Sequence, residues 1–126
     1  MSKSFCFDLD DTICFPNHSE TDTYEKYGKA YPNDQLISYM RCLKDKYDCH
    51  IVILSARRML THHGDLEAIK DDVGEITETW LKTHDVPYDE LVFGKPYASE
   101  YYVDDKAMNL EDFYTHMKKL QNEEQH

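Results

Sequence analysis

The chain has 126 residues, with 14 Lys or Arg, 25 Asp or Glu and a formal net charge of -11 at pH 7. This length predicts one domain over residues 1–126, long enough to bury a core of its own. The acidic balance argues against nucleic acid or an anionic membrane as a general partner, and no stretch approaches the length of a membrane span.

The first predicted element is a buried strand over residues 5–9, which leads into the acidic turn Asp10-Asp11-Thr12. Asp8 and Asp10 are two residues apart, so on an extended chain their side chains leave on the same side and converge. Oxygen donors of this kind bind Mg²⁺ and leave positions for water and substrate phosphate. The pattern favours a Mg²⁺ site at the end of this strand over a solvated acidic turn.

Residues 13–31 are polar and aperiodic, and we interpret them as a loop or small hairpin over the mouth of the first strand. A helix is predicted to start at Pro32-Asn33-Asp34, because Leu36, Met40 and Leu43 share one helical face. Residues 50–54 predict a second buried strand that ends at Ser55.

Residues 57–64 predict a loop containing Arg57, and a long helix is expected from near Asp65. The apolar stripe of that helix comprises Leu66, Ile69, Val73, Ile76, Trp80 and Leu81. A third strand over 91–93 leads to Gly94-Lys95-Pro96, where a cis Lys95–Pro96 bond is one way to aim the lysine inward. A fourth strand over 101–103 is predicted to end at Asp104-Asp105, and a last helix to precede a frayed tail over 121–126.

The order strand, helix, strand, helix, strand, strand, helix predicts an α/β fold, a Rossmann-like three-layer sandwich with a mainly parallel sheet. Every predicted strand stops at polar side chains suited to phosphate or metal: Asp8 to Thr12, Ser55, Lys95, and Asp104-Asp105. In an open sheet these ends share one edge, so the groups are expected to meet around one point. Any one of them alone is weak evidence, whereas all of them in this order are specific.

These groups, in this order, resemble the four signature motifs of the haloacid dehalogenase-like (HAD) hydrolase superfamily, over nearly the whole chain. Roughly forty residues separate Thr12 from the second strand and Ser55 from Lys95, mostly spent on one helix each, so no cap domain is expected. A narrower resemblance is to small phosphatases associated with capsular polysaccharide biosynthesis. Its stretches are Leu54-Ser55-Ala56-Arg57, Pro87-Tyr88-Asp89-Glu90-Leu91, Phe93-Gly94-Lys95-Pro96 and Tyr102-Val103-Asp104-Asp105-Lys106.

The superfamily resemblance implies a Mg²⁺-dependent phosphomonoester hydrolase that works through an aspartyl-phosphate. Asp8 is then the nucleophile, and Asp10 is the general acid and base whose backbone carbonyl also binds Mg²⁺. Ser55 and Lys95 are implied to bind and neutralise the transferring phosphoryl group, and Thr12 is placed with them on the substrate side. The metal ligands are Asp8, Asp10, Asp104 and Asp105, with Asp105 either sharing the metal or supporting the site. Arg57 either touches substrate or lies in solvent.

Three alternatives belong to other classes. A phosphate-accepting receiver module needs an aspartate at the end of the middle strand, where this chain has Ser55. Dehalogenases of the superfamily lack the second acidic residue, here Asp10. A catalytically inactive HAD-like relative that serves as a binding or interaction protein stays open. The expected substrate is a small phosphorylated metabolite such as a sugar phosphate.

The cysteines, Cys6, Cys14, Cys42 and Cys49, show no CxxC spacing and predict reduced, structural thiols. Asp8 precedes any long apolar run, so no signal peptide is expected and we predict a cytoplasmic protein. Without a cap, the cleft is either open, roofed by residues 13–31, or covered by a second subunit of a homo-oligomer.

Overall fold

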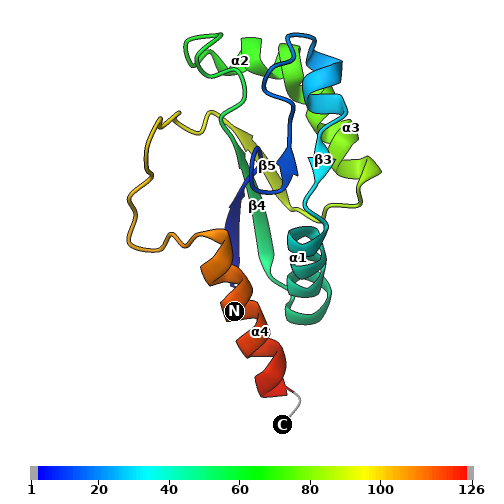
Figure 1. Ribbon diagram of the computed structural model, residues 1–126, viewed down its shortest axis with the longest axis vertical. Coiled ribbons are helices and arrows are strands. Elements are labelled where there is room, and N and C mark those ends of the chain that lie inside the picture. Colours follow the sequence, from blue (N-terminus) through cyan, green and yellow to red (C-terminus); the bar gives the residue numbers. More distant parts are fainter. Residues whose placement is uncertain (1–2, 125–126) are drawn as a thin grey trace.

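A computed structural model describes residues 3–124 of the chain (Figure 1). Its centre is a three-stranded sheet of order β1-β4-β5, formed by β1 (Ser4–Asp8), β4 (His50–Ser55) and β5 (Glu90–Phe93). Both pairings are parallel, and Phe7, Ile53 and Leu91 lie in one row across the sheet. The prediction of an α/β fold with a parallel sheet is confirmed, and its first three strands lie within one or two residues of the predicted ranges.

The predicted fourth strand is wrong. Residues 94–109, which we call the arm, leave β5, bow away from the sheet and return to α4 (Leu110–Glu124) without forming a strand (Figure 1). Tyr101, Tyr102 and Val103 are 82%, 49% and 96% exposed. These residue types favour strands only where a neighbouring strand pairs with their backbone, and here the outer edge of β1 is left unpaired by the described residues.

The helices cover one face of the sheet. Phe7, Ile51 and Ile53 point to this face and share a buried cluster with side chains of α1 (Asp34–Tyr47), α3 (Glu75–Thr83) and α4, among them Met40, Leu81 and Met117. On the opposite face Val52 and Leu54 are half-buried, and Cys6 and Val92 are exposed. Within residues 3–124 the structure therefore has two layers, and the third layer of the expected sandwich is not seen.

The start of α1 is confirmed. Asn33 precedes the helix and its side chain accepts a hydrogen bond from Leu36 N at 3.2 Å, so it satisfies one of the free N–H groups of the first turn. Asp48 ends the helix with φ of 51°, and the chain then enters β4 directly.

The long helix predicted from Asp65 forms, with a change of winding in its middle. Asp65 caps α2 (Leu66–Ile69), which continues through a π-helical turn η2 (Lys70–Gly74) into α3. Ile69 and Val73 are fully buried as predicted, whereas Leu66 is 45% exposed. A π turn shifts the side chains that follow it around the helix axis, which the regular spacing of the sequence does not reveal.

Residues 13–31 contribute most of a small hairpin, one of the two forms expected for them. β2 (Cys14–Phe15) pairs antiparallel with β3 (Tyr31–Pro32), and a π-helical turn η1 (Tyr24–Gly28) lies between them. The hairpin is fixed to the body of the protein because Trp80 Nε1 donates to Ala30 O at 2.9 Å. Its position over the carboxyl edge of the sheet is thus set by a buried contact with α3.

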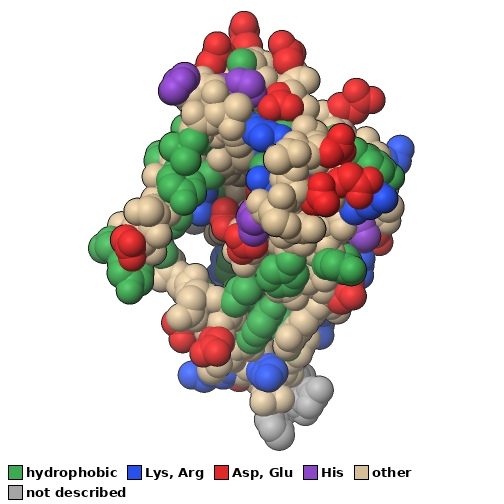
Figure 2. All heavy atoms as spheres, turned by 45° about the horizontal axis from the view of Figure 1, so that its top comes forward, with side chains coloured by type: hydrophobic (Ala, Val, Ile, Leu, Met, Phe, Trp, Pro, Cys, Tyr) green, Lys and Arg blue, Asp and Glu red, His purple; other side chains and the backbone are tan. Residues whose placement is uncertain are grey.

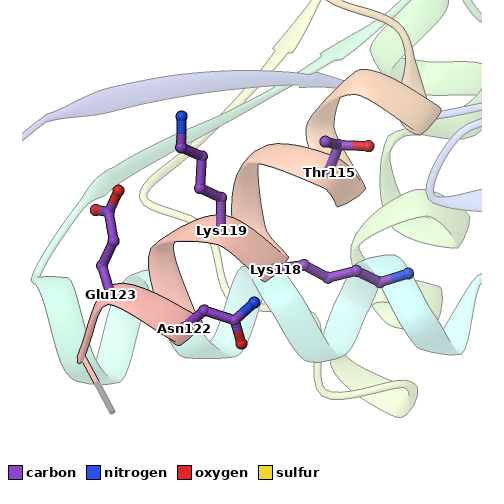
Figure 3. A pocket seen from close by; sticks show the side chains of 5 residues that line it. All are labelled: Thr115, Lys118, Lys119, Asn122 and Glu123. Atoms are coloured by element: carbon purple, nitrogen blue, oxygen red, sulfur yellow. The ribbon is translucent and has the colours of Figure 1, made fainter. Parts of the chain in front are cut away.

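The last helix packs through Phe113, whose ring lies edge-on to Phe7 at 5.4 Å, and it extends over residues 121–124 of the predicted tail. Residues 125 and 126 lie outside the described residues. A shallow depression of about 450 Å³ runs along α4, lined by Thr115, Lys118, Lys119, Asn122 and Glu123 (Figure 3). These side chains diverge from one helix and do not converge on a common point.

Between residues 3 and 124, every helix is too short or too polar to cross a bilayer.

Candidate functional site

Predicted site residues from three strands meet at the carboxyl edge of the sheet. Lys95 Nζ, just after β5, lies 3.1 Å from Asp8 Oδ1 at the end of β1. The backbone N–H groups of Gly94 and Lys95 donate to Ser55 O, at the end of β4, at 3.1 and 3.0 Å. This is the edge at which open α/β sheets bind ligands. The expectation that these strand ends converge holds for Asp8, Ser55 and Lys95.

Asp8 is engaged at both oxygens and still reachable. Thr12 Oγ1 donates to Oδ2 at 3.2 Å, while Lys95 neutralises the charge from the side of Oδ1. The side chain of Asp8 is 35% exposed, against 17% for Lys95. A half-exposed carboxylate of fixed direction, with a cation beside it, has the features of a nucleophile that must approach an anionic group.

Asp10 is held in place by an ion pair with Arg57. Arg57 Nε lies 3.1 and 3.0 Å from the two carboxylate oxygens, and Nη2 lies 2.8 Å from Oδ1. Cys14 Sγ donates to the same Oδ1 at 3.3 Å. Burial raises the pKa of Cys14, and the charge of Asp10 raises it further, so this residue stays a thiol.

Arg57 is buried, so the alternative that it lies in solvent is wrong. Arg57 as a whole is 3% exposed, and its Nη1 donates to Thr77 Oγ1 at 2.8 Å. The guanidinium carbon lies 4.2 Å from the ring centre of Tyr27 on η1. Burial by itself lowers the pKa of Arg57, but the hydrogen bond and charge of Asp10 outweigh it and raise that pKa. The contacts of Arg57 are thus with protein groups on β2, η1 and α3 as well as with Asp10.

Ser55 is fully buried, and its hydroxyl accepts a hydrogen bond from Arg57 N at 3.1 Å. In this structure the serine caps the turn that delivers Arg57. Its expected contact with a phosphoryl oxygen stays a prediction.

Asp104 and Asp105 are the predicted site residues that the structure does not bring to this edge. Both are exposed, and Asp104 Oδ1 accepts a hydrogen bond from Lys106 N at 2.8 Å. That bond, with a further one from Asp105, lowers the pKa of Asp104. The expectation that four carboxylates gather around Lys95 is therefore wrong for this conformation, because the strand that was to carry two of them does not form.

As placed, the carboxylates do not form a complete Mg²⁺ site. Asp8 is paired with Lys95 and Asp10 with Arg57, and residues 3–124 contain no group of three or more His, Cys, Asp or Glu side chains arranged around a common point. Asp8 and Asp10 lie at this edge of the sheet, whereas Asp104 and Asp105 lie on the arm.

The arm touches the site through Tyr102. Lys95 Nζ lies 4.0 Å from the centre of the Tyr102 ring. The phenol hydroxyl donates to Pro96 O at 2.5 Å and accepts from Ala98 N at 3.1 Å, and the Lys95–Pro96 peptide is trans. Figure 2 shows an opening between the arm and the body of the protein, with acidic and basic side chains at its edge. Lys95 is therefore aimed at Asp8 without a cis bond.

Gly94 provides the turn that aims Lys95, with φ of 100°, and Gly94→Ala is expected to cost about 1–2 kcal/mol of unfolding free energy. Its Cβ would also lie 2.7 Å from Leu66 Cδ2. Urea melts and turnover measurements test this. Gly64→Ala is a matched control, because Gly64 has φ of 78° and an added Cβ would meet Met59 Cε at an ordinary contact distance of 3.9 Å. Both variants should lose stability, and only Gly94→Ala should lose turnover. Equal turnover in the two variants contradicts the role given to this turn.

Thr77, Tyr27 and Cys14 are the residues at this site that sequence reasoning missed. Tyr27 lies in an aperiodic segment, which offers no pattern to single it out. Thr77 lies within the apolar stripe of its helix, between Val73 and Leu81, and is 1% exposed, so a hydroxyl at a core position was the available signal. Their shared property is contact with Arg57, which only the folded chain reveals.

No family model matches the chain, and no curated protein matches it. A solved structure does: the crystal structure of an MCSG target from Vibrio cholerae is 31% identical, with a TM-score of 0.72. The match covers 93% of this chain and 98% of the Vibrio cholerae chain, whose description states no activity. Identity at this level over nearly the whole of both chains shows that this chain and the Vibrio cholerae protein belong to one family.

Proposed function

We propose that the chain is a Mg²⁺-dependent phosphomonoester hydrolase that works through an aspartyl-phosphate. The observation that carries this proposal is the half-exposed Asp8 carboxylate at the carboxyl edge of the sheet, fixed by Thr12 and countered by Lys95 at 3.1 Å. The motif order adds membership of the HAD superfamily, in a capless and Rossmann-like form. The two crossovers support the capless form, because they are occupied by the hairpin with α1 and by the helix from Leu66 to Thr83.

In the proposed reaction an Asp8 oxygen attacks phosphorus, and the bond between phosphorus and the leaving oxygen breaks. Asp10 gives its proton to that oxygen, and Lys95 offsets the charge of the transferring group. Water then attacks the phosphorus of the aspartyl-phosphate, Asp10 takes up its proton, and phosphate and the Asp8 carboxylate are released. A bound Mg²⁺ supplies further neutralisation of phosphate charge.

A complete set of metal ligands requires the arm to change position. Asp104 and Asp105 are exposed on the arm, while the outer edge of β1 lies unpaired. Pairing of residues 101–103 with β1 supplies the missing strand and carries Asp104 toward Asp8. We propose that the arm takes this paired position when Mg²⁺ and phosphate bind.

The proposed substrate is a small phosphorylated metabolite such as a sugar phosphate, in a cytoplasmic setting. The acidic charge of the chain and the narrower resemblance to capsular polysaccharide phosphatases support this class. A screen of purified protein against a panel of phosphometabolites, with Mg²⁺ or with EDTA, tests the proposal by release of inorganic phosphate. Release from one class, only with Mg²⁺, is expected. No release from any member under either condition, while phosphate or a phosphorylated compound still binds, favours the inactive binding protein instead.

A further inference from the structure

Arg57 is the only charged side chain that is fully buried among residues 3–124. A cation in that position is costly unless every donor finds an acceptor. Here Nε and Nη2 are committed to Asp10, Nη1 to Thr77, and Nη2 also lies 3.5 Å from Cys14 Sγ. The guanidinium face stacks on Tyr27. The N–H donors of Arg57 therefore hold protein groups in place. To bind a substrate phosphate, the arginine would need N–H donors directed into the cleft.

The two oxygens of Asp10 are engaged unequally. Oδ1 accepts from Nε, from Nη2 at 2.8 Å and from Cys14 Sγ at 3.3 Å. Among the described residues, Oδ2 accepts one hydrogen bond, from Nε at 3.0 Å. Because a guanidinium and a carboxylate are both planar, paired contacts of this kind fix the plane of the carboxylate. Oδ1 therefore faces the protein, and Oδ2 is the oxygen that can still make a further hydrogen bond.

We propose that Arg57 is a positioning residue, which holds Asp10 so that Oδ2 faces the leaving oxygen of the substrate. This inference rests on the proposed function. It replaces the role of Arg57 as a substrate ligand and assigns Thr77 and Tyr27 as the groups that hold the arginine. Tyr27 belongs to the hairpin segment, so the position of that segment and the aim of Asp10 are linked through one guanidinium.

The test compares two probes that differ in their need for a proton on the leaving oxygen. p-Nitrophenolate leaves without protonation, whereas the alkoxide of glycerol phosphate does not. General acid catalysis contributes about 10²- to 10⁴-fold. The rate compared is that of leaving-group release in a single turnover, because Asp10 also serves the later hydrolysis of the aspartyl-phosphate, which is the same step for both probes. Arg57→Lys keeps the charge but loses the planar fork, so this rate should fall about 100-fold for glycerol phosphate and less than about tenfold for p-nitrophenyl phosphate. KM should change little for either probe.

Arg58→Lys is the matched control. It has the same charge, a neighbouring position and a guanidinium 5.3 Å from the same Tyr27 ring, but it pairs with Asp72 and Thr23 rather than with Asp10. It should leave the ratio of the two single-turnover rates unchanged. Thr77→Val removes the Nη1 acceptor while leaving Arg57 and Asp10 intact, and it should reproduce the loss with glycerol phosphate to a smaller extent. This second variant decides the matter if Arg57→Lys does not fold.

The outcomes separate the inference from the proposed function. A rise in KM of equal size for both probes in Arg57→Lys overturns the positioning role in favour of phosphate binding. An equal fall in the single-turnover rate of leaving-group release for both probes overturns it in favour of a purely structural role. If the wild-type protein releases phosphate from neither probe nor from any metabolite of the panel, the proposed function fails and the inference fails with it.

Discussion

Asp8→Asn is expected to reduce turnover by at least about 1,000-fold, because an amide keeps the shape of the side chain but cannot attack phosphorus. The melting temperature should change little. The amide oxygen can still accept from Thr12, and the pair with Lys95 is partly solvated, with side chains 35% and 17% exposed. The measurement is single-turnover phosphate release, together with a melting curve for each variant.

Asp11→Asn is the matched control for this prediction. Asp11 is a nearby carboxylate, exposed and paired with His18 at 3.0 Å. It should retain near wild-type turnover. If Asp8→Asn retains most of its activity, Asp8 is not the nucleophile, even when phosphate release by the wild-type protein supports a phosphatase.

The parts of the fold that depend on local sequence were predictable. Residues 50–54 form a strand because Ile51 to Leu54 are continuously apolar and Ile51 to Ile53 are β-branched. Asn33 starts a helix because its side chain satisfies a free N–H group of the first turn. Both signals lie within a few residues of the element they specify. The π turn over Lys70–Gly74 carries no such signal.

The parts that failed depend on partners distant in the chain. Tyr101 to Val103 has strand composition, but a strand forms only when its backbone pairs with another strand. Here these residues are exposed, and the described residues leave the outer edge of β1 unpaired. The sequence pointed to Arg57 as a site residue but did not show which groups it contacts. Its acceptors belong to Asp10 and Thr77, which lie 47 and 20 residues away in the chain. The convergence of Asp8 with Lys95 was predictable because parallel strands share one carboxyl edge.

Mg²⁺ with inorganic phosphate is expected to raise the melting temperature of the wild-type protein by about 10 °C. A ligand at 100 times its dissociation constant adds about 2.7 kcal/mol, which corresponds to about 10 °C for a domain of this size. The ligand-free protein should not carry strong self-repulsion, since Asp8 and Asp10 each have a cationic partner.

Asp104→Asn should remove most of that shift and leave the ligand-free melting temperature near the wild-type value, because Asp104 is exposed before the arm moves. Glu100→Gln is the matched control, since it removes one exposed negative charge from the same arm. An equal loss of the shift in both variants would mean that arm charge, rather than a metal ligand, accounts for the stabilisation. No shift in the wild-type protein, with phosphate present, overturns the metal site.

The same movement of the arm predicts a cross-link. In a parallel pair that sets Asp104 beside Asp8, Tyr102 lies beside Cys6, because both strands advance by the same spacing. Cys6 is exposed, whereas Cys14 and Cys49 are buried, so Tyr102→Cys offers a new thiol to one accessible partner on β1. Mild oxidation with Mg²⁺ and phosphate should give an intramolecular disulfide between these positions, identified by peptide mapping. Tyr97→Cys, at another exposed position of the arm, should give little of it. If Tyr102→Cys forms no such link while the melting temperature still rises, the metal is bound without the docked arm, and Asp104 is not its ligand.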